Sequence, residues 1–357
     1  MVILMMPSST RDYESFVLHL FDQVVIHRIS TVSELENLLY HGIPASEPCS
    51  LVIAAQLDSL GLNLPLLHMI QKLSSINPGA IQTATGYVIV QSANEWHTKT
   101  FASWLIFVLN ALGCRFMGHP VLEMTTGLNN LNQWEKTTGT ARGELILQLG
   151  EKSMRRFLSF APERFQRKPR LSVLHASSRT TSNTLSLWNL VKQHLKDIHI
   201  EEYHVANGTV MDCIGCPYHT CLYFGRQQSC FYGGDIIQEL FPAIERSDGL
   251  MWICPNYNDS LSANLMAVIN RLTALYRTQS FYEKKVYAVI VSGNSGSDAV
   301  ARQLIDALCI NKGFQLPPYF CLTATAYDPG SIYQVPAIEK RAAEFAALIM
   351  AEWTITQ

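Results

Sequence analysis

The chain has 357 residues, of which 48% are hydrophobic, so it can form two domains of ordinary size with a core each. The formal net charge is −2 and no basic run occurs, which argues against nucleic acid as a partner. No apolar stretch reaches the roughly 20 residues of a membrane span, and residues 1–6 lack the charge and length of a signal peptide. We therefore expect a cytoplasmic protein without a membrane segment, whose nine cysteines serve as thiols or metal ligands rather than disulfides.

Apolar runs alternate with helical patterns along the first 160 residues. They predict strands at residues 2–5, 24–29, 51–54, 87–90 and 118–122. An apolar helix is expected at residues 101–112, between the last two strands. The stretch 160–169 holds two prolines and breaks the apolar periodicity. It is the predicted junction between two domains, 1–160 and 169–357.

The second half shows the same alternation more clearly. Strands are predicted at residues 171–174, 198–205, 250–254, 286–291 and 320–323, and helices at 187–195, 263–276, 299–311 and 338–352. Strands that alternate with helices indicate βαβ units and a parallel sheet. Five strands per domain fit the doubly wound order of flavodoxin-like proteins. The expected fold class is therefore α/β, with two flavodoxin-like doubly wound parallel-sheet domains.

Two segments of the first half recur in the second half. Residues 87–94 align with 287–294 at an offset of 200, and residues 58–64 align with 259–265 at an offset of 201. Matches in the same order at nearly one offset predict an internal duplication. The copies differ most in one loop, since 49 positions separate Ser9 from Asp58 and 81 separate Ser178 from Asp259. The second copy therefore carries 32 extra residues, near 207–240.

A hydroxyl-rich loop follows the first predicted strand of the second half and opens a helix. Such a loop aims hydroxyls and backbone N–H groups at one point, in front of the positive end of the helix, and this suits a phosphate monoester. The alternative is a hydroxyl-rich helix cap without a ligand. The candidate phosphate ligands are Ser177, Arg179, Ser182, Asn183 and Thr184.

Two further loops come directly after buried strands. Because ligands bind at the carboxyl ends of strands in an open α/β sheet, all three loops together predict a nucleotide-like pocket. Glycines in the third loop let the backbone approach a flat ligand. The candidate residues of the two loops are Pro255, Asn256, Tyr257, Asn258, Ser292, Gly293, Asn294 and Gly296.

With these motifs, residues 169–357 resemble the NADPH-dependent FMN reductase and iron-sulfur flavoprotein family. The family's phosphate loop, Gly-Ser-x-Arg-x-x-Ser-x-Thr, is matched from Ala176 to Thr184, with alanine in place of the leading glycine. Its Pro-x-Tyr loop, which packs against the isoalloxazine, is matched by residues 255–258, and its third loop by 292–297 loosely. The resemblance implies bound FMN that accepts hydride from NADH or NADPH. It implies electron transfer to a small acceptor or a redox partner protein, and it assigns no catalytic side chain.

The first copy lacks these motifs. Residues 255–258 are replaced by Ala54, Ala55, Gln56 and Leu57, and Trp96 stands opposite Gly296, where its indole is expected to fill the space of a ring system. We therefore expect a first domain without cofactor. Reductases of this family commonly associate so that a second subunit walls the flavin pocket. A fused duplicate is expected to supply that wall as a pseudo-dimer within one chain, with a homodimer of whole chains as a further expectation.

Four cysteines, Cys213, Cys216, Cys221 and Cys230, lie within 18 residues of the extra segment. Such a set can close a cubane or a tetrahedral site. Iron-sulfur flavoproteins carry a compact four-cysteine cluster in this loop, with tighter spacing than here. A [4Fe-4S] cluster, zinc, and free or redox-active thiols therefore remain open. The alternative functions are an electron-transfer iron-sulfur flavoprotein and a zinc-stabilised, non-catalytic module.

Overall fold

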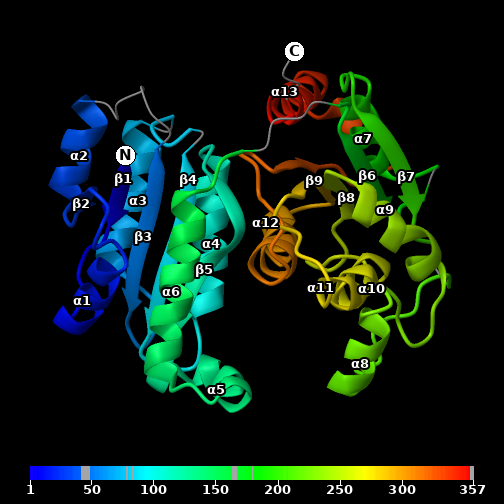
Figure 1. Cartoon of the computed structure of the whole chain (residues 1–357). Helices are drawn as coiled ribbons and strands as arrows, with labels where there is room; N and C mark the ends of the chain where they lie inside the picture. The colour runs from blue at the N-terminus through cyan, green and yellow to red at the C-terminus, as the bar shows by residue number, and fades with distance from the viewer. Residues whose placement is uncertain are drawn as a thin grey trace. The chain divides into compact units, whose positions relative to one another are not determined.

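The computed structural model describes residues 1–41, 49–77, 79–82, 84–162, 167–178, 180–206 and 208–353. The chain divides into two compact units, Met1–Ala161 and Pro162–Gln357 (Figure 1). Each unit contains one five-stranded sheet, and every strand pairing within the two sheets is parallel.

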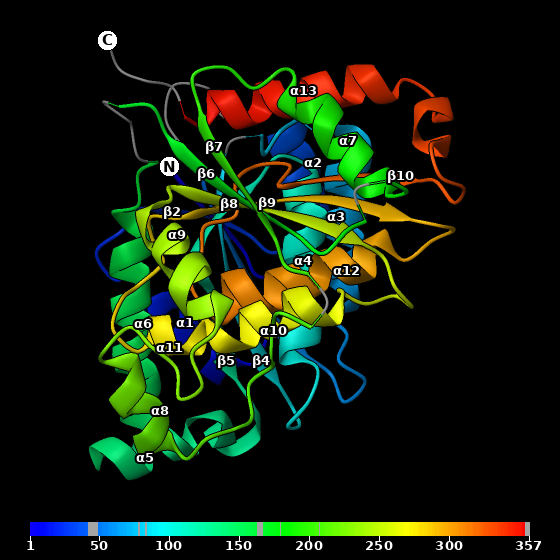
Figure 2. The same ribbon diagram turned by 90° about the vertical axis from the view of Figure 1, so that its right-hand side faces the viewer.

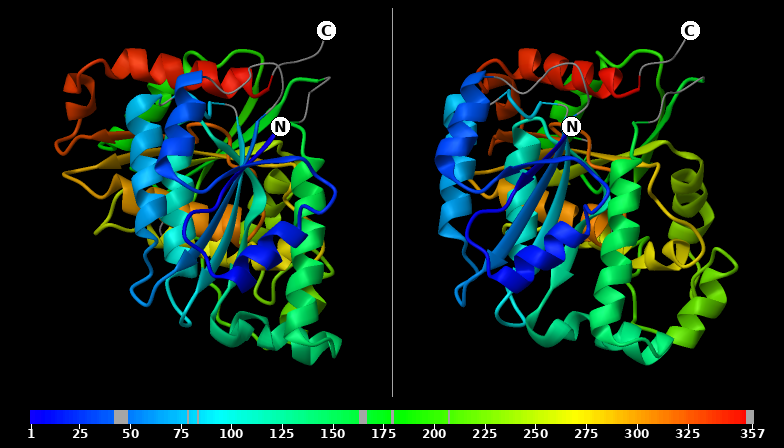
Figure 3. Two further views of the ribbon diagram at one scale, coloured as in Figure 1. Left: turned by 90° about the vertical axis from the view of Figure 1, so that its left-hand side faces the viewer. Right: turned by 60° about the vertical axis from the view of Figure 1, so that its left-hand side comes forward.

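The sheet of the first unit has the strand order β2-β1-β3-β4-β5. Its strands are β1 (Val2–Met5), β2 (Ile26–Ile29), β3 (Ser50–Leu57), β4 (Thr85–Ser92) and β5 (Arg115–Met124). Its helices are α1 (Arg11–His19), α2 (Val32–His41), α3 (Leu64–Ile76), α4 (Thr98–Ala111), η1 (Thr126–Leu131), α5 (Asn132–Thr138) and α6 (Arg142–Leu158). Helices α1 and α6 share one core cluster with the strands, and α3 and α4 lie on the opposite face of the sheet (Figure 3).

The sheet of the second unit has the equivalent order, β10-β9-β8-β6-β7. Its strands are β6 (Arg170–His175), β7 (His199–His204), β8 (Gly249–Pro255), β9 (Lys285–Ser292) and β10 (Cys321–Thr325). The helices up to β8 are α7 (Asn183–Lys192), α8 (Tyr218–Gly225), η2 (Ile236–Leu240) and α9 (Phe241–Arg246). After β8 come α10 (Ala263–Arg271), α11 (Thr273–Tyr276), α12 (Ser297–Leu304), η3 (Ile305–Ile310), η4 (Ser331–Gln334) and α13 (Ile338–Ala351).

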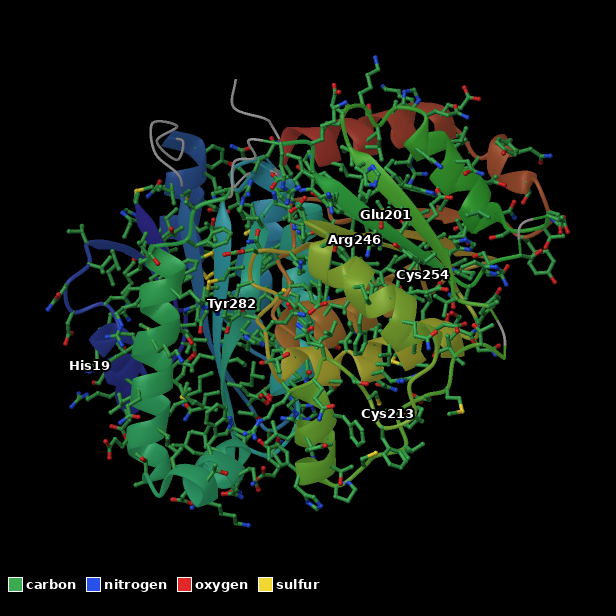
Figure 4. All side chains as sticks on the ribbon, turned by 45° about the vertical axis from the view of Figure 1, so that its right-hand side comes forward. His19, Glu201, Cys213, Arg246, Cys254 and Tyr282 are labelled. Atoms are coloured by element: carbon green, nitrogen blue, oxygen red, sulfur yellow. The ribbon has the colours of Figure 1, made fainter. Side chains whose placement is uncertain are left out.

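Helices cover both faces of the second sheet. Helices α7 and α13 pack together on one face, and α9, α10 and α12 lie on the other (Figure 2). Strands β8 and β9 are buried at every position, which explains the apolar runs at residues 250–254 and 286–291. Strand β7 is an edge strand with polar side chains, and Arg246 on α9 donates hydrogen bonds to its Glu201 and Tyr203 (Figure 4). The bond from Arg246 lowers the pKa of Glu201 to about 2, so this carboxylate stays charged at neutral pH.

The predicted fold class is confirmed, because both sheets have the doubly wound order of flavodoxin-like domains. Two predicted helices are each divided, 263–276 into α10 and α11 and 299–311 into α12 and the π-helix η3. The sequence analysis did not anticipate α6, although its buried residues Ile146, Gly150, Met154 and Phe157 follow a helical spacing. Within the described ranges, no helix is both long and apolar enough to cross a bilayer.

The last two strands of the two sheets pair in the same register. β4 and β9 have bounds that differ by 200 positions. Gln91 pairs with Met124 between β4 and β5, and Val291 pairs with Ala324 between β9 and β10, which preserves that offset. A duplicated domain would have this property, and the duplication remains a prediction.

Candidate functional site

Three loops of the second unit follow three adjacent strands. The loop at residues 176–182 follows β6, the loop that begins at Asn256 follows β8, and residues 293–296 follow β9. Since these strands are neighbours in a parallel sheet, the three loops lie at one edge of it. The structure therefore brings together the three segments that the sequence analysis singled out.

The first loop contains a buried hydroxyl group without a partner. Ser177 is fully buried, and its Oγ makes no hydrogen bond to any residue that the structure describes. A buried hydroxyl without a partner destabilises the free protein, and a ligand that bonds to it would remove this cost. Thr184 is also buried, on the first turn of α7. Arg179, the predicted cationic ligand, lies outside the described residues.

Ser182 caps helix α7. Its Oγ accepts a hydrogen bond from the backbone N–H of Leu185 at 3.2 Å. Its own O–H remains able to donate, so the capping role and a phosphate contact are compatible. Helix α7 has ten residues, and its positive end faces this loop.

Asn183 ties the first loop to the segment after β10. Its Nδ2 donates to the carbonyl oxygen of Asp328 at 2.8 Å, and its Oδ1 accepts from the backbone N–H of Gly330 at 3.0 Å. The side chain of this predicted phosphate ligand is thus engaged within the protein. It positions the start of α7, where its backbone N–H lies in the first turn.

Asn256 joins the second loop to the third. Its Nδ2 donates to Ser292 Oγ at 3.0 Å, to the carbonyl oxygen of Ser295 at 2.9 Å and to Asp259 Oδ1 at 3.1 Å. Ser292 is fully buried, and its Oγ also bonds to Ser297 Oγ at 2.7 Å. The Oδ1 of Asn256 is buried without a partner, so one acceptor at this point remains unused.

The second loop is a tight hairpin that exposes a tyrosine. Tyr257 and Ser260 form an antiparallel bridge, and Asn258 and Asp259 between them have φ values of 53° and 57°. Two successive residues in the left-handed region form a type I′-like turn, which asparagine and aspartate tolerate well. Tyr257 follows Pro255 and is 53% exposed, so its ring is free to contact a ligand.

The third loop depends on one glycine. Gly296 has a φ of 86°, and a Cβ atom there would lie 1.9 Å from Asp259 Oδ1 and 2.9 Å from Asn256 Nδ2. The second and third loops therefore touch through a position that has no room for a side chain. Asn294 is exposed on the same loop.

Tyr327 is a site residue that the sequence analysis missed. It lies in the loop after β10, is 78% exposed, and its Cδ2 would be 2.9 Å from a Cβ atom on Gly293. Its position directly after a predicted strand was the available signal, because every strand of a parallel sheet ends at the same edge. Tyr257 and Tyr327 thus place two exposed aromatic rings on loops at this edge.

The corresponding edge of the first unit is closed by a glutamine. Gln56, at the end of β3, accepts a hydrogen bond from the backbone N–H of Thr10 at 2.8 Å and donates to Thr10 Oγ1 at 3.1 Å. Thr10 is the residue before α1, so the glutamine bonds to the N–H group that would face a phosphate. By strand register Gln56 corresponds to Pro255, because Gln56 pairs with Gln91 on β4 and Pro255 pairs with Val291 on β9, so the second unit has no side-chain amide at this position.

The residue opposite Gly296 is His97 rather than Trp96. His97 precedes α4 with a φ of 78°, as Gly296 precedes α12, because the loop of the first unit is one residue longer. The His97 side chain lies against Gly61, where a Cβ atom would be 2.4 Å from its Cγ. Trp96 is therefore not the counterpart of Gly296, and its indole is 70% exposed.

The four clustered cysteines line one cavity of about 280 Å³. Cys213 and Cys216 lie on the extended segment before α8, Cys221 lies on α8, and Cys230 follows it (Figure 4). Across the ranges that the structure describes, no three His, Cys, Asp or Glu side chains are placed to hold a metal ion. The predicted metal ligands thus line one cavity without forming a ligand set in the described part of the chain.

Cationic side chains line the same cavity. Arg271 is 3% exposed, its guanidinium lies 4.5 Å from the ring centroid of Tyr232, and its Nε has no partner. Arg277 also lines the cavity and stacks on Tyr218 at 4.7 Å. Burial lowers the pKa of the nearby Lys312, with the charge of Arg277 acting in the same direction. The two guanidinium groups make this cavity suitable for an anionic group.

We predict that Gly296→Ala destabilises the second unit. The new Cβ atom would displace Asp259 and Asn256, and the positive φ would strain any residue with a side chain. The expected loss is about 1–3 kcal/mol in the free energy of unfolding, measured by denaturant titration.

Gly143→Ala is the matched control, because nothing lies within 4 Å of its Cβ position in α6. Alanine there should leave stability unchanged or raise it slightly. Equal stability of the two variants would show that the loops do not depend on Gly296.

Comparison with known proteins gives one family match. Residues 169–327 match the family of NADPH-dependent FMN reductases. A search of the curated proteins finds no match to this sequence.

Several solved structures are similar to about half of the chain. An azoreductase from Bacillus anthracis str. Sterne has 10% identity and a TM-score of 0.38 over 52% of this chain and 100% of its own. An NAD(P)H:quinone oxidoreductase from Methanothermobacter marburgensis has 14% identity and a TM-score of 0.37 over 50% of this chain and 98% of its own. The family match, the strand order and the three loops agree. Residues 169–327, most of the second unit, are therefore similar to the NADPH-dependent FMN reductase family, and this similarity supports a flavin oxidoreductase.

Proposed function

We propose that the chain is an NAD(P)H-dependent oxidoreductase that binds one FMN, in its second unit, and passes electrons to a small acceptor. The observation that carries the proposal is the buried hydroxyl of Ser177, which has no partner among the described residues and lies on the loop that opens helix α7. A phosphate monoester supplies the acceptors that this hydroxyl and the helix N-terminus lack. The family match of the same residues supports FMN as the source of that phosphate.

The residues at the sheet edge have separate roles in this proposal. Ser177, Ser182 and the first turn of α7 hold the phosphate, together with Arg179. The hairpin after Pro255 and the loop from Ser292 to Gly296 border the ring, and Tyr257 and Tyr327 offer aromatic faces to it. Asn256 fixes the two loops relative to each other. FMN supplies the redox chemistry when bound, taking hydride from NADH or NADPH and returning electrons to the acceptor.

The first unit is proposed to bind no FMN. Gln56 bonds to the backbone N–H of Thr10, and its amide lies where a phosphate would have to approach. Displacing it would break two hydrogen bonds, each worth about 1 kcal/mol. We propose that this unit instead walls the flavin pocket as a pseudo-dimer, within one chain or within a homodimer. The cytoplasm is the proposed compartment, on the basis of the cysteine content of the sequence.

A second candidate function is that of an iron-sulfur flavoprotein that relays single electrons. The observation that favours it is that all four cysteines line one cavity beside Arg271 and Arg277. Guanidinium groups would offset the negative charge of four thiolates. In this candidate Cys213, Cys216, Cys221 and Cys230 would hold a [4Fe-4S] cluster, with a zinc site or free thiols as the competing outcomes.

We predict that Ser177→Ala weakens FMN binding. One hydrogen bond to a charged phosphate is worth about 1.5–3 kcal/mol, so the dissociation constant should rise about 10- to 150-fold. Ser177→Asp should abolish binding, because a carboxylate repels phosphate. Fluorescence titration with FMN measures both.

The control for this prediction is Ser9→Ala, in the corresponding loop of the first unit, which should bind FMN as the unchanged chain does. Unchanged FMN affinity in Ser177→Ala and Ser177→Asp, or two FMN per chain, would contradict the proposed site.

The iron-sulfur candidate predicts about four iron and four sulfide per chain after anaerobic purification. Cys221→Ser should lose both, whereas Cys49→Ser, at a half-buried thiol of the first unit, should keep them. One zinc without sulfide would indicate a zinc site. If all four cysteines are found as free thiols and no metal is bound, the cavity is a thiol site and the [4Fe-4S] cluster is excluded.

The pseudo-dimer proposal predicts that the fragment 162–357, which has its own core, is impaired as an enzyme. An open flavin pocket should lower kcat/KM with NAD(P)H while FMN still binds through the phosphate loop. Turnover of the fragment is compared with that of the whole chain at equal FMN content. Equal turnover would show that the first unit takes no part in the site.

A further inference from the structure

The first unit has a cavity of about 440 Å³ at the carboxyl ends of β3, β4 and β5. This volume falls within the range of small-molecule sites. Its position matches the edge that carries the candidate flavin site in the second unit. None of the described residues that line it is charged. The cavity therefore suits an uncharged ligand.

Gln91 offers two unused hydrogen-bond donors to this cavity. Its Oε1 accepts from Gln56 Nε2 at 2.9 Å, which fixes the amide and leaves its Nε2 without a partner in the described part of the chain. Gln56 is itself held by Thr10. A half-buried amide that presents only N–H groups recognises a carbonyl oxygen. Leu57 and Leu128 add apolar surface to the lining.

The rim of the cavity is strained. Gly127 and Leu128 have φ values of 57° and 56° within η1. The left-handed region costs a residue such as leucine about 1–2 kcal/mol, and strain of this kind gathers at ligand sites. Arg142 holds the segment in place by donating to the carbonyl oxygen of Gly127 at 2.9 Å and to Asn129 Oδ1 at 2.7 Å. The cavity is thus preorganised rather than a gap between loose loops.

We propose that the first unit binds a second ligand, an uncharged ring compound that carries a carbonyl oxygen and no phosphate. Gln91 donates to the carbonyl oxygen, and Leu57 and Leu128 contact the ring. Gln56 excludes a phosphate from the adjacent helix end. Two classes of compound have these properties. One is a flavin without phosphate, represented by riboflavin, and the other is a free pyridine carboxamide, represented by nicotinamide.

The test uses the whole chain with FMN at saturating concentration, so that any flavin site in the second unit is filled. Riboflavin and nicotinamide are titrated separately by equilibrium dialysis, and hydrogen exchange locates the binding. One equivalent of either probe should bind, with slower exchange at residues 125–131. The probe that binds identifies the source.

Gln91→Leu and the isosteric Gln91→Glu should each raise the dissociation constant about tenfold or more, because either change removes the donors. Gln71→Leu, on the exposed surface of α3, is the control and should bind as the unchanged chain does. The exchange measurement on the unchanged chain decides the location even where a variant fails to fold.

The proposal is overturned if neither probe binds, if binding is unchanged in both Gln91 variants, or if the protected residues belong to the second unit. FMN content is measured in the same samples. Loss of FMN binding would refute the proposed function while protection at residues 125–131 would still support this site, so the two failures are distinguishable.

Discussion

All strands of each sheet run in one direction, and the site depends on this constraint. The loops after β6, β8 and β9 have to share one edge, so residues about 80 and 115 positions apart along the chain become neighbours. Burial of β8 and β9 on both faces holds that edge rigid. Asn256 and Gly296 then fix the second and third loops against each other. A ligand at the edge meets positions that the sheet has already set.

One amide at this edge distinguishes the two units. In the first unit Gln56 reaches toward Thr10 and satisfies the N–H group in front of α1. In the second unit the strand register puts Pro255 at this position, and the next residue, Asn256, bonds to Ser292 and Ser295 of the third loop. In the loop before α7, the Ser177 hydroxyl has no partner in the described part of the chain. The two sheet edges thus differ at one position, which holds a glutamine in the first unit and a proline in the second.

The cysteine-rich segment shows a different kind of constraint. Its four thiols meet at one cavity only because α8 turns the chain back toward Arg271 and Arg277. Both guanidinium groups are held by stacking on tyrosines of the same segment. The cavity that the four cysteines line therefore also contains two guanidinium groups and several aromatic rings. This setting distinguishes these cysteines from the buried Cys114, Cys254 and Cys309.

The sequence by itself determined the α/β class, the five strands of each half and the three loops of the site, because strand periodicity and loop chemistry are local properties. Local patterns also placed the four cysteines in one segment. Only the tertiary structure decided how side chains are used. It engaged Asn183 with the segment after β10, placed His97 opposite Gly296 and brought Tyr327 to Gly293. The placement of these three side chains depends on contacts between residues distant in the chain, on a loop longer by one residue and on the direction of the Asn183 amide. No local pattern encodes such placements.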